Sequence, residues 1–253
     1  MAEIFEERLV LDETMASSLI YDEHLVRYEL AKSYSQGKVV LDVACGSGYG
    51  SYLLADKAEK VWAIDINQEA LALAEKKYQH PKIKFLADDV EILSKVGDKM
   101  IDLAVSFETI EHLKNPDNYL EQLKRVLKTD GLALISTPNR QVFGQKNPWH
   151  LREYTKEDFS QILAKYFKNV VILEQFNALA SVIGDSTDGR VLVGKNKQAL
   201  YFVALASDVE INLPKNSFVS LNESALIKRD NNPAWRFINK FYSYLNKFGF
   251  FKK

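Results

Sequence analysis

Apolar and polar positions follow two different periods along the chain, one typical of buried strands and one of amphipathic helices. Short apolar runs predict strands at 39–43, 61–65, 83–87, 101–106, 132–136, 170–173 and 199–206. Apolar residues three and four positions apart predict helices at 22–35, 51–58, 68–78, from 116 to near Gly131, and from 155 onward. This alternation predicts an α/β fold with a mostly parallel sheet. The last two strands lack a long helix between them, so we expect them to pair antiparallel.

A glycine-spaced turn follows the first predicted strand. The apolar run 39–43 leads into Gly46 and Gly48, and a helix is predicted directly after them. A strand, a tight turn and a helix N-terminus together place backbone N–H groups at the carboxyl edge of the sheet. Glycine lets the backbone approach a ligand closely because it has no Cβ. The sequence therefore predicts a cofactor site at this turn.

The spacing of the turn narrows the choice of cofactor. A dinucleotide site favours G-x-G-x-x-G, whereas the glycines here fall as G-x-G-x-G. Asp42 stands just before them, and a carboxylate suits an ammonium group better than a pyrophosphate. Asp65 ends the next predicted strand, nineteen residues past Gly46, where an acid accepts hydrogen bonds from ribose hydroxyls.

The glycine turn, Asp42 and Asp65, in this order, resemble class I S-adenosylmethionine-dependent methyltransferases. The resemblance implies S-adenosylmethionine as cofactor and a doubly wound, seven-stranded, mostly parallel sheet in the order 3-2-1-4-5-7-6 with one reversed strand. It implies that Arg27 meets the methionine carboxylate and that Asp88 accepts from the adenine amine, although a solvated cation and a solvated acid are the simpler alternatives. The implied cofactor-binding residues are Arg27, Asp42, Ala44, Gly46, Gly48, Asp65, Ile66, Asp88, Asp89, Val90 and Phe107.

A cluster of ionisable residues follows the fourth predicted strand. Glu108, Glu111 and His112 lie where a methyl group would be offered to an acceptor. A neutral hydroxyl is a weak nucleophile, so it needs a base or a metal, and histidine is a common base. The three residues also resemble the Glu-x-x-Glu-His of ubiquinone-biosynthesis O-methyltransferases, which implies a divalent metal. General base, metal ligand and cap of the following helix all stay open for His112.

Two loops are predicted to form the wall of an acceptor site. The segments 137–140 and 147–154 are punctuated by proline and rich in histidine, arginine and tryptophan. The run 147–154, together with Glu7-Arg8 and 23–28, resembles methyltransferases of glycan and O-antigen assembly. That resemblance implies a carbohydrate or other small hydroxyl acceptor, and a quinone-like acceptor is the alternative. The predicted substrate residues are Arg8, His150, Arg152 and Tyr154.

Composition sets the outer limits. With 253 residues and 47% apolar content, the chain can form one sizeable core, predicted at 1–206 with a lid at 1–37, and an extension at 207–253. A formal charge of −1 gives no reason to expect nucleic acid as a partner. The single cysteine, Cys45, excludes a disulfide framework and is expected to fill the turn as a small residue.

The extension carries a predicted amphipathic helix at 234–248, with an aromatic face opposite a basic polar face. We expect it to dock on the domain or on a second subunit, and a membrane surface is the alternative. The N-terminus lacks the apolar core of a signal peptide, and no apolar run reaches the ~20 residues that span a bilayer. A cytoplasmic location is therefore expected.

Two other functions remain to be weighed against methyl transfer. A nicotinamide-dependent dehydrogenase would use a similar strand and turn, but the glycine spacing and the Glu-Glu-His cluster argue against it. A scaffold protein could keep the cofactor pocket without turnover and recruit a partner in glycan assembly.

Overall fold

The structure, a computed structural model, describes residues 19–144, 147–177 and 198–214. Arg8 and the helix predicted at 234–248 lie outside the described residues, so those predictions have no counterpart below. The division between a domain at 1–206 and an extension at 207–253 stays a prediction for the same reason. In the described part of the chain, no helix is both long and apolar enough to cross a membrane.

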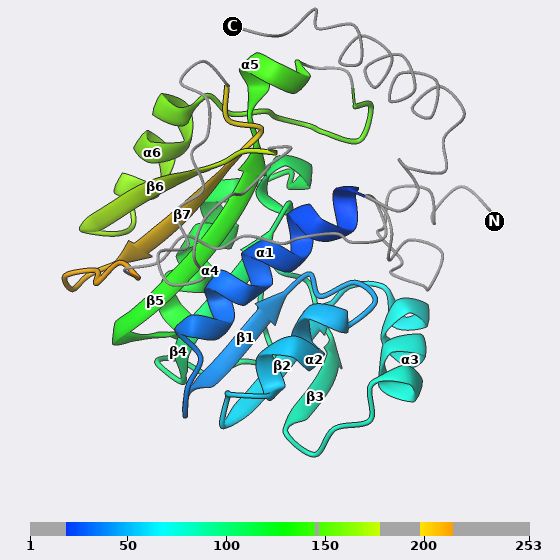
Figure 1. Cartoon of the computed structure of the whole chain (residues 1–253). Helices are drawn as coiled ribbons and strands as arrows, with labels where there is room; N and C mark the ends of the chain where they lie inside the picture. The colour runs from blue at the N-terminus through cyan, green and yellow to red at the C-terminus, as the bar shows by residue number, and fades with distance from the viewer. Residues whose placement is uncertain (1–18, 145–146, 178–197, 215–253) are drawn as a thin grey trace, which may run out of the picture.

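A seven-stranded sheet forms the centre of the molecule (Figure 1). Its order is β3-β2-β1-β4-β5-β7-β6, as the resemblance implied. β7 runs antiparallel to both β5 and β6, and the other neighbouring pairs are parallel, which confirms a single reversed strand. The strands are β1 (Val39–Val43), β2 (Lys60–Asp65), β3 (Ile83–Ala87), β4 (Ile101–Phe107), β5 (Leu127–Pro138), β6 (Asn169–Gln175) and β7 (Tyr201–Ser207).

The helices begin where the sequence offers caps. Asn67 and Asn115 accept backbone hydrogen bonds at the starts of their helices, and Thr155 forms a capping box with Asp158. The helices are α1 (Leu19–Ser33), α2 (Tyr49–Ala55), α3 (Gln68–Lys77), the 3-10 helix η1 (Ile110–His112), α4 (Pro116–Val126), α5 (Arg140–Phe143) and α6 (Lys156–Ala164).

Some predicted boundaries were wrong. The helix expected to reach near Gly131 ends at Val126, because Leu127 already pairs with Ile101 in the sheet. The register then shifts between Ile101 and Leu103, so β5 carries an irregularity and is much longer than the predicted strand at 132–136. The helix expected from Ser51 begins two residues earlier, at Tyr49, because Gly48 serves as its N-cap.

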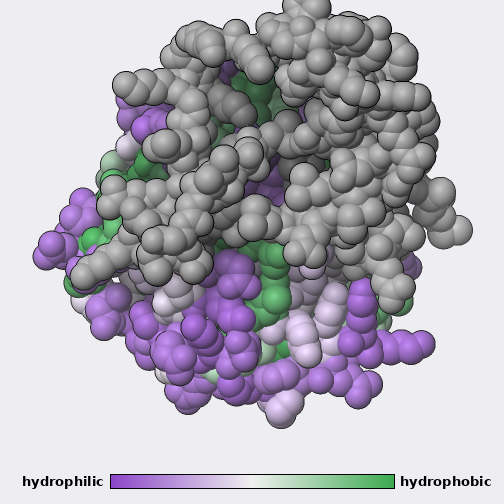
Figure 2. All heavy atoms as spheres, in the orientation of Figure 1, coloured by the Kyte–Doolittle hydropathy of each residue, from purple (hydrophilic) through white to green (hydrophobic). Residues whose placement is uncertain are grey.

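Apolar side chains cover both faces of the sheet. On one face α4 and α6 contribute buried residues such as Leu123 and Phe159, and on the other α1 and α2 contribute Ala31 and Leu54. Where side chains are coloured in Figure 2, hydrophilic residues make up most of the lower surface. The carboxyl ends of β1 and β4, which are neighbours, meet at one edge of the sheet.

Candidate functional site

The turn after β1 has an unusual backbone. Ala44, Gly46 and Gly48 have φ angles of 57°, 54° and 80°, in the left-handed region. A Cβ at Gly48 would lie 2.7 Å from the Cβ of Ala74, so only glycine fits there. A Cβ at Gly46 would meet nothing within 4 Å, so the turn is open on that side. The predicted turn therefore offers backbone beside open space.

Asp65, at the end of β2, holds this turn in place. One carboxylate oxygen accepts from the backbone N–H of Gly46 at 2.9 Å, and the other accepts from the N–H of Asn67 at 2.9 Å. The side chain is buried, and the next residue, Ile66, is 63% exposed. The sequence predicted Asp65 beside the turn, and the structure brings the two together.

Asp42 lies beneath the turn rather than at its open side. Its carboxylate accepts from the Tyr28 hydroxyl at 3.1 Å and from the Ser51 hydroxyl at 2.6 Å. Burial raises the pKa of Asp42 to about 7, against the opposing effect of these hydrogen bonds. Asp42 thus joins β1 to α1 and α2, and its predicted contact with an ammonium group stays a prediction.

The acidic pair after β3 organises its own loop. Asp88 accepts from the Ser94 hydroxyl and from the N–H groups of Asp89 and Lys95, at distances from 2.8 to 3.0 Å. Asp89 accepts from the N–H of Glu91, and Val90 is buried. The loop lies next to the end of β2, and the predicted contact of Asp88 with adenine stays a prediction.

Arg27 of α1 is buried against the segment after β4. Its guanidinium pairs with Glu108, donates to the Gln175 side chain at 3.3 Å and lies 4.6 Å from the centre of the Tyr201 ring. His24 also contacts the Glu108 carboxylate, at 3.1 Å. The sequence predicted neither partner of Glu108. The contact of Arg27 with a methionine carboxylate stays a prediction.

Glu108 has a positive φ of 49°, in the left-handed region that residues other than glycine rarely adopt. Burial alone would raise the pKa of its carboxyl, but Arg27 and His24 outweigh burial and lower it to about 2. Phe107, just before it, is buried and packs edge to face on Tyr28 at 5.0 Å. Glu108 is therefore a negative charge that residues of α1 hold in place.

Glu111 has the opposite electrostatic character. It is fully buried, and burial together with the charge of Glu108 raises its pKa well above the usual value. One oxygen accepts from the Thr137 hydroxyl at 3.2 Å, and the other has no hydrogen-bond partner among the described residues. Burial thus favours the neutral form of the Glu111 carboxyl, the opposite of what holds at Glu108.

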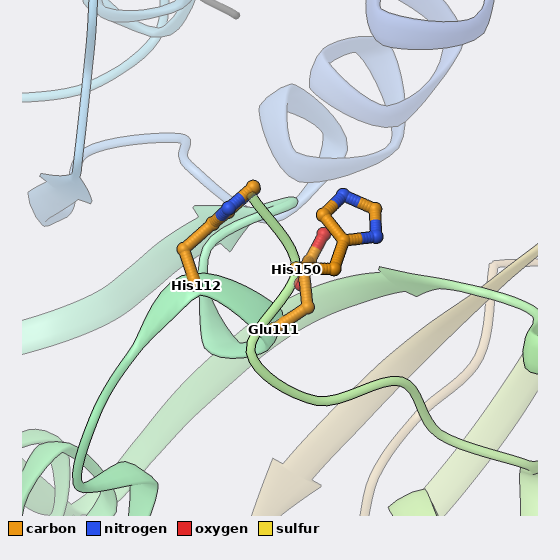
Figure 3. A group of neighbouring side chains, drawn as sticks. All are labelled: Glu111, His112 and His150. Atoms are coloured by element: carbon orange, nitrogen blue, oxygen red, sulfur yellow. The ribbon is translucent and has the colours of Figure 1, made fainter. Parts of the chain in front are cut away.

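Two histidines stand beside Glu111. His112 and His150 lie with ring centres 4.8 Å apart and planes inclined by 76°. Figure 3 shows the Glu111 carboxyl directed toward the two rings, and potential ligand atoms of all three side chains lie within 4.8 Å of one another. The predicted metal set of Glu108, Glu111 and His112 is therefore not assembled, because His150 takes the place of Glu108. A cation here would require Glu111 to ionise.

His150 lies in a polar network within the predicted acceptor wall. Its Nδ1 is 3.0 Å from the buried Glu153 carboxylate, and its Nε2 is 2.9 Å from the Asn147 amide nitrogen. A cavity of about 420 Å³ adjoins this network. It is lined by Glu108, Pro138, Val142, Phe143, Asn147, His150, Glu153 and Tyr201.

The predicted substrate residues Arg152 and Tyr154 are not among the described residues that line this cavity. Arg152 is exposed, and its backbone N–H donates to the carbonyl of Glu111 at 3.1 Å. Tyr154 is buried in the core against Phe159, with ring centres 5.9 Å apart. Sequence reasoning missed Glu153, although its position three residues after His150 in the same run was a usable signal.

Comparison with known proteins gives consistent matches. Residues 41–135 match a family model described as "Methyltransferase domain". A Mycobacterium tuberculosis protein described as "Probable S-adenosylmethionine-dependent methyltransferase" is 31% identical over 148 residues, 56% of this chain and 53% of that protein. A ubiquinone biosynthesis O-methyltransferase of Rickettsia canadensis is 29% identical over 180 residues, 68% of this chain and 72% of that protein. The chain thus spans about half the length of the mycobacterial relative.

Solved structures share the fold. A crystal structure of a SAM-dependent methyltransferase from Archaeoglobus fulgidus matches with a TM-score of 0.55 at 20% identity. The match covers 73% of this chain and 93% of that one. At this level of identity the likeness concerns the fold alone, and it confirms the expected Rossmann-like architecture.

Proposed function

We propose that this chain, which belongs to the S-adenosylmethionine-dependent methyltransferases through its domain at residues 41–135, methylates a hydroxyl of a small acceptor. The observation that carries the proposal is that a cofactor turn and an acceptor cavity occur at one edge of the sheet. The turn follows β1, and the cavity includes Glu108 at the end of β4, the neighbouring strand.

The residues of the turn fit the cofactor. The open side at Gly46 leaves room for a ligand against the backbone, and Asp65 stands at the strand end where a ribose would be held. S-Adenosylmethionine supplies a methyl group on a positively charged sulfur that acts as leaving group. The chain has to bind it, orient the acceptor and accept a proton from the hydroxyl.

The cavity lining suits a ring that carries hydroxyl groups. Pro138, Phe143 and Tyr201 offer apolar and aromatic surface, whereas Glu108, His150 and Glu153 offer polar atoms. Sugars combine an apolar ring face with polar edges, so the proposal favours a sugar or glycan precursor. The base is one of two neighbouring histidines, His112, which the sequence predicted, and His150.

A second candidate acceptor is a quinone-like phenol. The similarity to a ubiquinone biosynthesis O-methyltransferase favours it, and the aromatic side chains of the cavity suit a flat ring. A third possibility is a scaffold that binds the cofactor without turnover. These alternatives differ in what the protein does once the cofactor is bound.

Calorimetric titration of the whole chain tests the first step. We expect S-adenosylhomocysteine to bind and NADH not to bind, and the reverse result would overturn the proposal. The second step is incubation with methyl-labelled S-adenosylmethionine and either methyl hexosides or catechol, followed by mass spectrometry. Methylation of a hexoside supports the sugar acceptor, methylation of catechol supports the phenol, and cofactor binding without either product supports the scaffold.

A further inference from the structure

We infer that His150, rather than His112, is the general base of this site, and that Glu153 is its positioning residue. The inference rests on the proposed function, because it assigns the proton acceptor for methyl transfer to a hydroxyl. It is carried by the hydrogen-bond network around His150, by burial and by the lining of the cavity.

The network around Asn147 fixes the tautomer of His150. The Asn147 side-chain oxygen accepts from the backbone N–H of Trp149 at 3.0 Å. The amide nitrogen of Asn147 must therefore be the group that faces Nε2 of His150, at 2.9 Å. An amide nitrogen can only donate, so Nε2 carries the lone pair and the proton of the neutral ring lies on Nδ1.

The Glu153 carboxylate accepts a hydrogen bond from the Nδ1–H group of His150. The carboxylate lies 3.0 Å from Nδ1, and the Glu153 side chain is only 1% exposed. The second oxygen of Glu153 has no hydrogen-bond partner in the part of the chain that the structure describes. A buried carboxylate at Nδ1 orients the ring and stabilises the imidazolium that forms when Nε2 accepts a proton. Base and orienting carboxylate are thus both present.

The two histidines differ in their position relative to the cavity. His150 and Glu153 line it, whereas His112 does not. His112 instead contacts the backbone carbonyl of Trp149 through Nδ1, at 3.2 Å. A carbonyl only accepts, so this nitrogen of His112 donates to the loop that carries His150. His112 therefore supports the loop and His150 faces the acceptor.

The reaction step balances with these groups. The hydroxyl oxygen of the acceptor forms a bond to the methyl carbon while the bond from that carbon to sulfur breaks, and its electron pair stays on sulfur. The hydroxyl proton moves to Nε2 of His150, where the acceptor replaces the Asn147 amide. The resulting imidazolium is balanced by Glu153, and its proton then passes to water.

The first test needs no acceptor. We expect nitrogen NMR of the histidine rings in the whole chain to show His150 protonated at Nδ1 when neutral, and this preference to weaken in Glu153→Gln. A neutral ring protonated at Nε2 would overturn the assignment. The remote His80→Ala variant identifies a histidine signal that does not depend on Glu153.

The second test uses whichever of the methyl hexosides or catechol the wild-type chain methylates. We expect His150→Ala to lower kcat by about 10²–10⁴, to retain S-adenosylhomocysteine binding, and to regain part of its turnover with added imidazole. His112→Ala should lower kcat less and should not respond to imidazole. Full turnover by His150→Ala would overturn the inference while the proposed function stands. A wild-type chain that methylates neither probe counts against the proposed function, and the tautomer still decides the state of His150.

Discussion

The turn after β1 and the segment after β4 lie on neighbouring strands but are built in different ways. The turn is made from one continuous stretch, and its shape depends on backbone angles at Ala44, Gly46 and Gly48. The segment after β4 acquires its chemistry from distant elements, since Glu108 is held by α1 and His112 contacts the loop at 147–150. The turn thus depends mainly on its own backbone geometry, with support from Asp65 of β2, whereas the segment after β4 depends on long-range contacts.

The charges of the segment after β4 show the same dependence on neighbours. Glu108 and Glu111 are three residues apart, yet one pKa is lowered to about 2 and the other is raised well above its usual value. Arg27 and His24 outweigh burial at Glu108, whereas at Glu111 burial and the charge of Glu108 outweigh the stabilising effects of Thr137 and Arg27. Such divergence between neighbouring carboxyls is common at functional sites.

Removing the long-range contact should have the largest effect. We expect Arg27→Met to lower the free energy of unfolding by about 3 kcal/mol at pH 7, because it leaves the Glu108 charge short of a buried partner. Urea unfolding measures this. The difference from wild type should shrink as pH falls from 4.5 towards 2, since the stability from a lowered carboxyl pKa is lost in that range.

Lys32→Met on the same helix is the matched control. Lys32 pairs with the exposed Asp56, so its loss should cost much less stability than the loss of Arg27. The double variant Arg27→Met with Glu108→Gln should recover part of the lost stability, because no unpaired charge remains. Equal effects of Arg27→Met and Lys32→Met would contradict the buried pair.

The next largest effect concerns the turn after β1. We expect Asp65→Ala to weaken S-adenosylhomocysteine binding about a hundredfold, because the carboxylate both supports the turn and stands where ribose hydroxyls would bind. Calorimetry measures the change. Asp98→Ala, which removes an exposed partner of Arg125, should leave binding unchanged. Unaltered affinity in Asp65→Ala would defeat the placement of the cofactor.

Substitutions at Gly48 and Gly37 distinguish the cost of backbone strain from the cost of crowding by neighbouring atoms. Gly48→Ala should lower the free energy of unfolding by about 2 kcal/mol or more, because a Cβ there is strained and also meets Ala74 and Phe85. Gly37 has a similar φ of 66° but open space around it, so Gly37→Ala should cost only about 1 kcal/mol. Thermal unfolding of both variants measures the difference. Equal costs would show that crowding at Gly48 is relieved by movement.

The smallest expected effect has the opposite pH dependence to that of Glu108. A raised folded-state pKa at Glu111 means that wild type loses stability as pH rises above 4.5, where the unfolded chain releases the proton. We therefore expect Glu111→Gln to be slightly more stable than wild type at pH 8 and no more stable at pH 4. The gain should stay under about 1 kcal/mol, because the new amide nitrogen finds no ready acceptor. Melting temperatures at the two pH values decide the sign.

The sequence predicted what depends on neighbouring residues. The strand order, the caps at Asn67 and Asn115 and the capping box at Thr155 all follow from local pattern together with the family resemblance. The sequence did not predict the end of α4. The apolar spacing of the helix continues to Leu127, but Leu127 pairs with β4 in the sheet. Pairing with Ile101 is a tertiary contact, and it overrides the helical pattern.

The local sequence pattern also could not predict that Glu111, His112 and His150 come together. Glu108, Glu111 and His112 are adjacent in sequence, but the carboxylate of Glu108 pairs with α1. His150 joins the cluster from the loop before α6, which spacing alone does not indicate. The sequence therefore placed Glu108, Glu111 and His112 after β4, and the fold determines which side chains they contact.

One helix reaches both ligand regions. Tyr28 of α1 donates to Asp42 beneath the turn, and its ring lies so close to Gly50 that a Cβ there would come within 2.0 Å of it. Arg27, just before Tyr28, and His24, one turn earlier, hold Glu108 at the cavity. A displacement of α1 would therefore change the turn after β1 and the cavity together.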